Sequence, residues 1–201
     1  MDWTMPYSAN LTAEQFLFYE IRIVAKQYIL GESVDEIIEH IRQEGLFQYP
    51  TERKISKITR ACYKRLVALD NDGLVRELAS SPSVEAKQIN LYAMMRYSRL
   101  VHEFMVGLIG EKYRKQDMSF TRKDMNMFFS RLREQNDNVA SWSEATFTKL
   151  KQVLMKCLIE CEMLDNVRDS SLNPILISAE LEIGIREKND LGSLAAFNCF
   201  R

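Results

Sequence analysis

The sequence is poor in the residues that interrupt helices. It holds 7 glycines and 4 prolines in 201 residues, while helix-favouring residues are plentiful, 10 methionines among them. A chain made of β-strands needs glycine or proline at many closely spaced turns. This scarcity disfavours an all-β fold and predicts an all-α protein, built as a multi-helix bundle.

Cysteine and histidine are also scarce. The four cysteines lack the density and spacing of a disulfide framework or a zinc site, so we expect reduced thiols. Cys157 and Cys161 lie one helical turn apart, but two thiols alone do not complete a tetrahedral metal site. His40 and His102 belong to no motif for metal binding or nucleophile activation, and no glycine-rich phosphate loop occurs. We therefore expect no metal, no cofactor, no small-molecule substrate and no enzymatic activity.

Long apolar runs are missing as well. The most apolar stretches, Phe16 to Leu30 and Val101 to Ile109, are interrupted by charge or too short to cross a bilayer, which takes roughly 20 apolar residues. At the N-terminus, Asp2 stands where a signal peptide is basic, and no apolar run follows. We expect a cytoplasmic protein that does not contact a membrane.

Apolar residues recur at helical spacing along most of the chain. Three pairs have the spacing of helix caps, namely Ser33 with Glu36, Thr121 with Asp124, and Ser141 with Glu144. The predicted helices cover about residues 12–30, 33–45, 51–70, 84–109, 121–135, 144–164 and 178–188. The polar stretch from 110 to 119 loses the apolar period, so we predict two helical units, residues 1–110 and 111–201.

A turn-rich segment follows the helix predicted at 144–164. Residues 169–173 read Asp-Ser-Ser-Leu-Asn, and the segments 164–168 and 174–177 flank them. This arrangement permits a small β-hairpin near the C-terminus. The hairpin would serve as the wing of a winged-helix-like C-terminal unit.

Positive charge is concentrated on one predicted helix, although the whole chain has a formal net charge of −1. At 100° per residue, one side of this helix carries a row of cations opposite its apolar side. The row consists of Arg53, Lys57, Arg60 and Lys64, with Lys54 and Arg65 flanking it. Such a face suits a phosphate backbone, because each bound phosphate displaces condensed counterions. The alternative is an ordinary solvated face, neutralised by Asp35, Glu36 and Glu39 of the neighbouring acidic helix.

A second candidate surface lies on the helix predicted at 144–164. Its polar side carries Thr148, Lys149, Gln152 and Lys156, and no acidic residue occurs between 145 and 159. These residues are suited to a recognition helix, in which small and amide side chains reach base edges. The long connection from 136 to 143 favours a purely structural helix instead.

Further cations precede that helix and are predicted to line a groove beside it, with ordinary surface solubility as the alternative. They are Lys112, Arg114, Lys115, Arg122, Lys123, Arg131 and Arg133.

Several segments resemble the BrxA family of BREX bacteriophage-exclusion systems. They are Tyr7 to Thr12, Phe18 to Glu20, Ser33 to Ile37, the helix from Thr51 to Leu69, Trp142 to Thr146, Cys161 to Leu164, and Asn173 to Ser178. The resemblance implies an all-helical, non-enzymatic, DNA-binding accessory protein. It also implies partners among the other BREX components, which include a methyltransferase and an ATPase.

Together these observations lead to a hypothesis of sequence-tolerant binding to double-stranded DNA, largely through backbone contacts. Two alternatives stay open. In the first alternative, the protein is an adaptor that joins defence-complex subunits without touching nucleic acid. In the second, it binds RNA, because charge patterning alone does not distinguish RNA from DNA.

Overall fold

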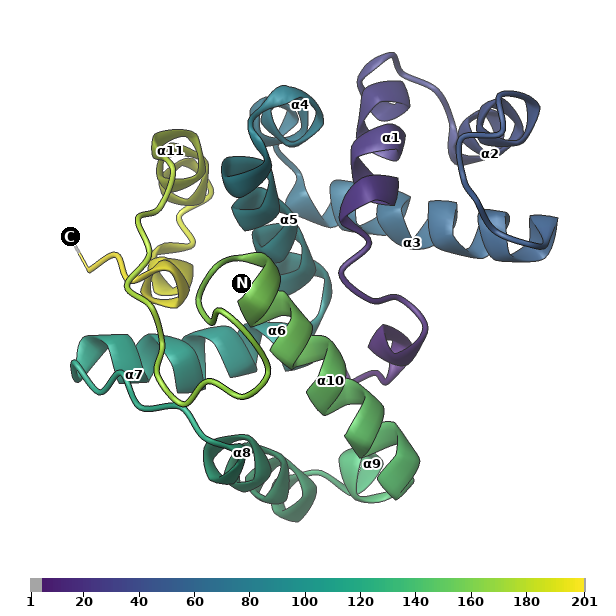
Figure 1. The fold of residues 1–201 in the computed structure, drawn as a ribbon. Helices are drawn as coiled ribbons and strands as arrows, with labels where there is room; N and C mark the ends of the chain where they lie inside the picture. Colours follow the sequence, from purple (N-terminus) through teal and green to yellow (C-terminus); the bar gives the residue numbers. More distant parts are fainter. Residues whose placement is uncertain (1–4, 201) are drawn as a thin grey trace. The chain divides into compact units, whose positions relative to one another are not determined.

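The computed structural model describes residues 5–200, which form eleven α-helices, two 3₁₀ turns and one π-helical turn (Figure 1). The predicted all-α fold is confirmed, and no β-strand occurs within that range. The chain divides into two compact units. The central unit runs from Phe16 to Tyr97, and the flanking unit combines the N-terminal residues up to Gln15 with the chain from Ser98 onward.

The central unit is built around its longest helix, α3, which packs against α1, α2 and α5 (Figure 1). Its helices are α1 (Phe18–Ile29), α2 (Val34–Gln43), α3 (Glu52–Leu69), α4 (Asp72–Ser80) and α5 (Ser83–Tyr97). The predicted capping box of Ser33 and Glu36 is confirmed at the start of α2. Helix α1 begins later than predicted, because residues 13–17 are not helical and its N-cap Leu17 takes a left-handed backbone conformation, with φ 52°.

The flanking unit begins with the short turn η1 (Asn10–Thr12), which contacts α10. Its other elements are α6 (Arg99–Phe104), the π-helical turn η2 (Met105–Gly110), α7 (Glu111–Arg114), α8 (Arg122–Gln135), α9 (Asp137–Ala140), α10 (Glu144–Glu160), α11 (Ala179–Glu187) and η3 (Leu191–Phe197). An aromatic row joins α6, α8 and α10 in the core. Its edge-to-face contacts run from Phe104 to Phe128, on to Phe129 and then to Phe147, with ring centroids 5.4 to 5.7 Å apart.

The prediction of one long helix at 84–109 is wrong, because the helical path is interrupted at Ser98. The backbone of Ser98 is extended, and its hydroxyl accepts a hydrogen bond from the N–H of Val101, which starts α6. The helical path then continues through η2 across Gly110, where a side chain would meet Ala195 at 2.9 Å. The units therefore divide at 97/98, whereas the sequence predicts a division after residue 110.

The predicted β-hairpin is also wrong. Residues 161–178 form an irregular loop in which the side chain of Asp169 accepts hydrogen bonds from the N–H groups of Asp165 and Asn166. These local bonds occupy backbone donors that a strand ladder would use. Ser171, within the predicted turn, pairs instead with the α7–α8 connection, through an isolated antiparallel bridge to Ser119. No β-hairpin wing follows α10 in the part of the chain that the structure describes.

Helices α8 and α10 of the flanking unit both begin at a side-chain cap, but only the cap of α8 is the predicted one. The predicted capping box of Thr121 and Asp124 is confirmed at the start of α8. The cap predicted at Ser141 is wrong, because Ser143 accepts the hydrogen bond from the N–H of Thr146 that begins α10. The short helix α9 occupies the connection between α8 and α10, which the sequence predicts as a loop.

Candidate nucleic-acid interface

One side of α3 carries a row of exposed cations, which we call the α3 stripe: Arg53, Lys57, Arg60 and Lys64. The row forms because residues at intervals of three and four share one side of a helix. Ile55, Ile58 and Cys62 on the opposite side are buried and fix the rotation of α3. The structure thus places all four of these predicted residues together on an exposed surface.

Three members of the α3 stripe have no acidic partner. No carboxylate within residues 5–200 forms an ion pair with Arg53, Lys57 or Lys64. The fourth, Arg60, donates a hydrogen bond from Nη2 to Oδ1 of Asp35 at 2.6 Å. Neutralisation by the acidic helix therefore reaches Arg60 alone.

The other two acidic residues proposed as neutralising partners serve α2 itself. Glu36 accepts a hydrogen bond from the N–H of Ser33 at 2.7 Å, and its pKa is lowered by these bonds to Ser33. Glu39 lies 3.8 Å from Arg42 and accepts a hydrogen bond from Gln43. Both carboxylates are engaged by residues of the loop or helix that carries them.

The two cations predicted to flank the stripe have different environments. Lys54 is exposed, and its ammonium lies 4.6 Å from the ring centroid of Tyr49. Arg65 is fully buried, and its Nη1 donates a hydrogen bond to the carbonyl of Phe16 at 3.1 Å. Its assignment to the interface needs correction, because a side chain in the core does not reach a phosphate. It belongs to the packing of α3.

The polar side of α10 matches the predicted recognition helix only in part. Thr148, Gln152 and Lys156 are exposed in one row, whereas Lys149 is half-buried. No acidic side chain interrupts the row. Without a wing beside it, α10 is a helix that packs on the core with one side and exposes a row of polar groups on the other.

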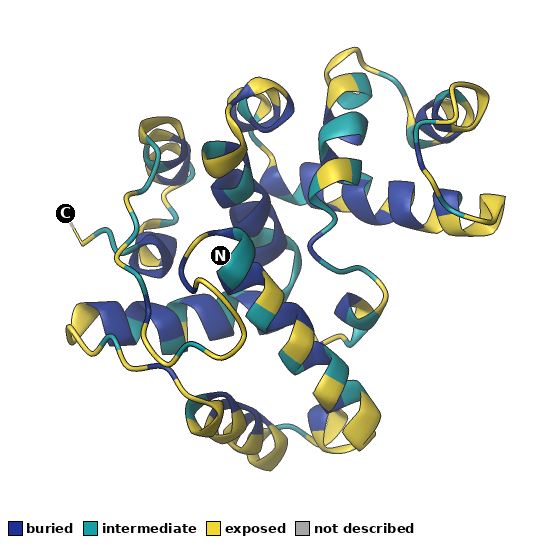
Figure 2. Cartoon of the chain, viewed as in Figure 1, coloured by how far each residue is buried: buried dark blue, intermediate teal, exposed yellow. Residues whose placement is uncertain are grey.

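Helix α8 has a sharply divided surface, with its buried side against the core and its other side exposed (Figure 2). Arg122 and Lys123 are exposed near its start and form no ion pair with any described carboxylate. A shallow hollow lies over the exposed side. It is lined by Lys123, Asn126, Met127, Ser130, Arg131 and Glu134. Arg133 lies outside this hollow, 2.7 Å from Glu144 on α10.

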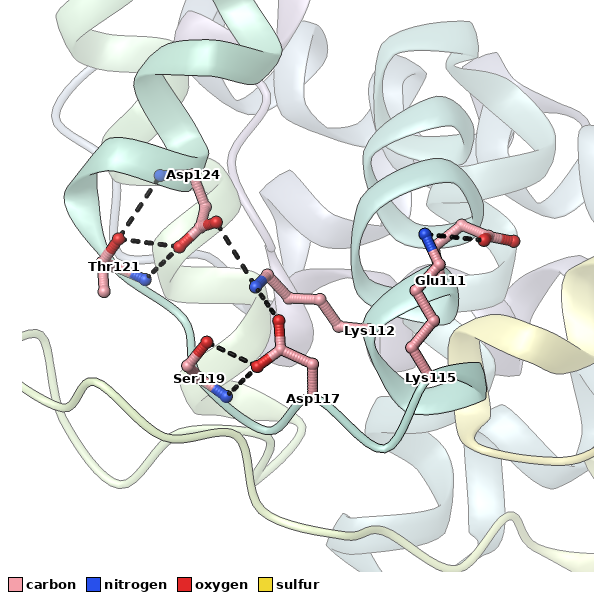
Figure 3. Close-up of polar contacts among 7 residues, drawn as sticks. All are labelled: Glu111, Lys112, Lys115, Asp117, Ser119, Thr121 and Asp124. Carbon is pink, nitrogen blue, oxygen red and sulfur yellow. Dashed lines mark hydrogen bonds and ion pairs between the residues drawn. The ribbon is translucent and has the colours of Figure 1, made fainter.

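The cations upstream of α8 do not form an open basic groove. The side chain of Lys112 is only 10% exposed, and its Nζ lies 2.9 Å from Asp117 and 3.3 Å from Asp124 (Figure 3). These bonds outweigh burial and raise the pKa of Lys112. The pKa of Asp117 is lowered to about 2 by hydrogen bonds from Ser119 and Lys112. This cluster joins α7 to α8.

The remaining upstream cations are paired with a single residue. Arg114 and Lys115 both contact Glu111, which lies one helical turn before them. Sequence reasoning missed these pairs, although the spacing of Glu111 to Lys115 is a recognised signal for an ion pair on a helix. The contact of Lys112 with Asp124 depends on how α7 meets α8, and no local spacing reveals it.

The two histidines show no catalytic arrangement. Burial lowers the pKa of His102 to about 4, with a partial opposing effect from Asp190. His40 lies 3.3 Å from the side-chain nitrogen of Gln27. Within the described chain, no three histidine, cysteine or acidic residues cluster as metal ligands, and no helix is long and apolar enough to span a bilayer.

Comparison with known proteins places the chain in a family. A model of the BrxA family matches residues 5–189. The BREX protein BrxA of Bacillus cereus (strain H3081.97) is 34% identical over 160 residues, which cover 80% of each protein. The BREX protein BrxA of Paramagnetospirillum magneticum (strain ATCC 700264 / AMB-1) is 20% identical over 186 residues, or 92% of each.

The fold has a counterpart among solved structures. The crystal structure of an uncharacterized protein from Magnetospirillum magneticum superposes with a TM-score of 0.81, at 20% identity, over 95% of this chain and 97% of that one. At this identity the likeness establishes the fold alone. The match to the family model over nearly the whole chain, together with the 34% identical relative, shows that the protein belongs to the BrxA family of BREX phage-defence components.

Proposed function

We propose that this protein binds double-stranded DNA through phosphate contacts from the α3 stripe, as a non-enzymatic accessory component of its BREX system. The observation that supports this function is the exposure of Arg53, Lys57 and Lys64 without an acidic partner in the described chain. In a protein of net charge −1, these residues gather unneutralised positive charge on one surface. Such a protein would work in the cytoplasm beside other BREX components.

The length of the stripe sets the size of the expected contact. At a rise of 1.5 Å per residue, Arg53 and Lys64 are separated by about 16 Å along α3. One turn of duplex DNA measures about 34 Å, so the stripe covers roughly half a turn of backbone. Contacts of this kind follow the backbone and carry little sequence information.

The flanking unit supplies further proposed contacts. Lys156 on α10, and Arg122 and Lys123 on α8, are exposed cations suited to phosphate. Thr148 and Gln152 carry groups that hydrogen-bond to base edges, with Lys149 at the border of the same row. Without a wing, we expect these residues to add affinity rather than strong sequence preference.

A salt series tests the role of the α3 stripe. The variant Arg53→Gln/Lys64→Gln is compared with the matched control Lys26→Gln/Arg76→Gln, which removes one lysine and one arginine exposed on α1 and α4. Affinity for a mixed-sequence duplex is measured between low and moderate salt. We expect the stripe variant to lose about 1.8 in the slope of log affinity against log salt, about 0.9 for each lost phosphate contact.

Two outcomes would contradict the proposal. Equal losses in the stripe variant and the control would mean that only net charge matters. Absence of binding to the duplex at low salt would exclude the function itself. Duplex RNA of the same length is the third arm, and equal affinity for both polymers would replace DNA binding by general polyanion binding.

The exposed side of α8 favours a second candidate, an adaptor that holds BREX subunits. Met127 is 52% exposed, and the hollow around it contains both cations and Glu134. A mixed face with an apolar centre suits a protein partner better than a polyanion. The variant Met127→Gln adds no charge beside Lys123. It is expected to lose a partner that otherwise survives nuclease treatment during co-purification, while it keeps its affinity for DNA. Retention of every partner would remove this candidate.

A further inference from the structure

One exposed ion pair interrupts the α3 stripe. Arg60 lies on the same side of α3 as Arg53, Lys57 and Lys64. Within residues 5–200 it alone of the four forms an ion pair with a carboxylate, that of Asp35 at 2.6 Å. The side chains are 50% and 77% exposed, and ion pairs this open contribute little to the stability of a fold. Helices α2 and α3 pack together, and each buries apolar residues. These include Ile37, Ile38, Ile41, Ile55 and Ile58, all buried.

The position of Asp35 is set by the start of α2. Ser33 and Glu36 close a capping box there, which fixes the backbone of the first turn. Because Glu36 is bonded to Ser33, Asp35 is the acidic residue of this turn that reaches α3. Its carboxylate therefore lies on the guanidinium of Arg60, the group that a phosphate oxygen would contact. Carboxylates and phosphates use the same N–H donors of arginine.

We propose that Asp35 is an intramolecular competitor of phosphate, which occupies Arg60 in the free protein and weakens binding to the DNA backbone. This inference rests on the proposed function of the α3 stripe. Asp35 acts in two ways, because it withholds one cation of the stripe and places a negative charge beside the incoming phosphates. Removal of its charge then strengthens binding to any duplex, whatever its sequence.

The variant Asp35→Asn tests this role, since it removes the charge and keeps the size of the side chain. We expect affinity for a mixed-sequence duplex at low salt to rise about fivefold, the scale of one exposed ion pair. We also expect the salt slope to steepen by about 0.9, because Arg60 becomes available as one more phosphate contact. Glu39→Gln is the matched control, since it makes the same charge change on α2 in a residue that pairs with Arg42.

A double-mutant cycle separates competition at Arg60 from a general effect of charge. Arg60→Gln and Asp35→Asn/Arg60→Gln are measured under the same conditions. We expect most of the gain from Asp35→Asn to disappear when Arg60 is already replaced. An equal gain with and without Arg60, or an equal gain from Glu39→Gln, would overturn the competition.

The outcomes also distinguish this inference from the proposed function. Wild-type binding that weakens in Arg53→Gln/Lys64→Gln but does not change in Asp35→Asn would overturn the role of Asp35 alone. No binding by the wild type at low salt would overturn both. Because Asp35 is exposed, thermal unfolding of Asp35→Asn is expected to match the wild type, which confirms that folded proteins are compared.

Discussion

The α3 stripe and the segment around α7 are both rich in lysine and arginine, but the structure treats their charges differently. On α3, Arg53, Lys57 and Lys64 are exposed and have no acidic partner among the residues described. Around α7, Lys112 is enclosed by Asp117 and Asp124, and the next cations share Glu111. Available positive charge therefore depends on where the carboxylates fall, not on the number of basic residues in a segment.

The largest expected effect comes from a basic residue of α3 that is absent from the stripe. We expect Arg65→Ala to lower the free energy of unfolding by about 3 kcal/mol, because it removes a fully buried side chain and its bond to Phe16. Its neighbour Lys64 is exposed, so Lys64→Ala should change stability by less than about 0.5 kcal/mol. Urea unfolding followed by circular dichroism measures both. A stable Arg65→Ala protein with weakened DNA binding would return Arg65 to the interface.

The cluster around Lys112 should give the next largest effect. We expect Lys112→Ala to destabilise the protein by about 2 kcal/mol, because Asp117 and Asp124 lose the cation that they share. The control Lys115→Ala removes an exposed cation at the C-cap of the same short helix and is expected to cost less than about 0.5 kcal/mol. Denaturant unfolding of the two variants measures the difference. Equal free energies of unfolding for Lys112→Ala and Lys115→Ala would show that the buried ion pairs of Lys112 do not stabilise the fold more than the exposed pair of Lys115.

The smallest expected effect is a dependence on acid. The folded pKa of Asp117 is about 2, below its ordinary value of 3.8, so its interactions stabilise the fold above about pH 4 and are lost as the pH falls toward 2. We expect Asp117→Asn to lower stability at neutral pH and to flatten the decline of the melting temperature between pH 4 and 2. The α3 stripe offers the contrast, because Lys57→Gln should leave this decline unchanged. An unaltered decline in Asp117→Asn would mean that other groups govern acid unfolding.

Local signals explain how much of the fold was predictable. Ser33 with Glu36, and Thr121 with Asp124, define helix starts from residues three apart, and both capping boxes form. Ser98 gives no such signal, because the apolar period continues on both sides of it. The loop at 161–178 contains turn residues typical of a hairpin, yet Asp169 accepts hydrogen bonds from neighbouring backbone N–H groups, and Ser171 pairs with Ser119. Pairing between residues so far apart in the sequence leaves no local pattern from which it could be predicted.

The candidate interface was predictable to a similar degree. Helical spacing correctly groups Arg53, Lys57, Arg60 and Lys64, since all four share the side opposite the apolar row. The same spacing places Arg65 only about 20° around the helix from Ile58, which is a warning that it is buried. The ion pair of Asp35 with Arg60 joins two helices. The sequence therefore identifies Asp35 as one of several acidic residues that could neutralise the stripe, but it does not predict which of them does so.

The division of the flanking unit between both ends of the chain affects the order of assembly during synthesis. Tyr7 leaves the ribosome before the central unit, yet its hydroxyl donates a hydrogen bond to Glu103 at 2.6 Å and its carbonyl accepts one from Asn138. The central unit, by contrast, is one continuous stretch from Phe16 to Tyr97. Domains fold in the order in which they emerge, so the whole central unit has been synthesised before Glu103 and Asn138, the partners of Tyr7. Tyr7 is thus translated before the central unit but reaches these native contacts only after that unit has emerged.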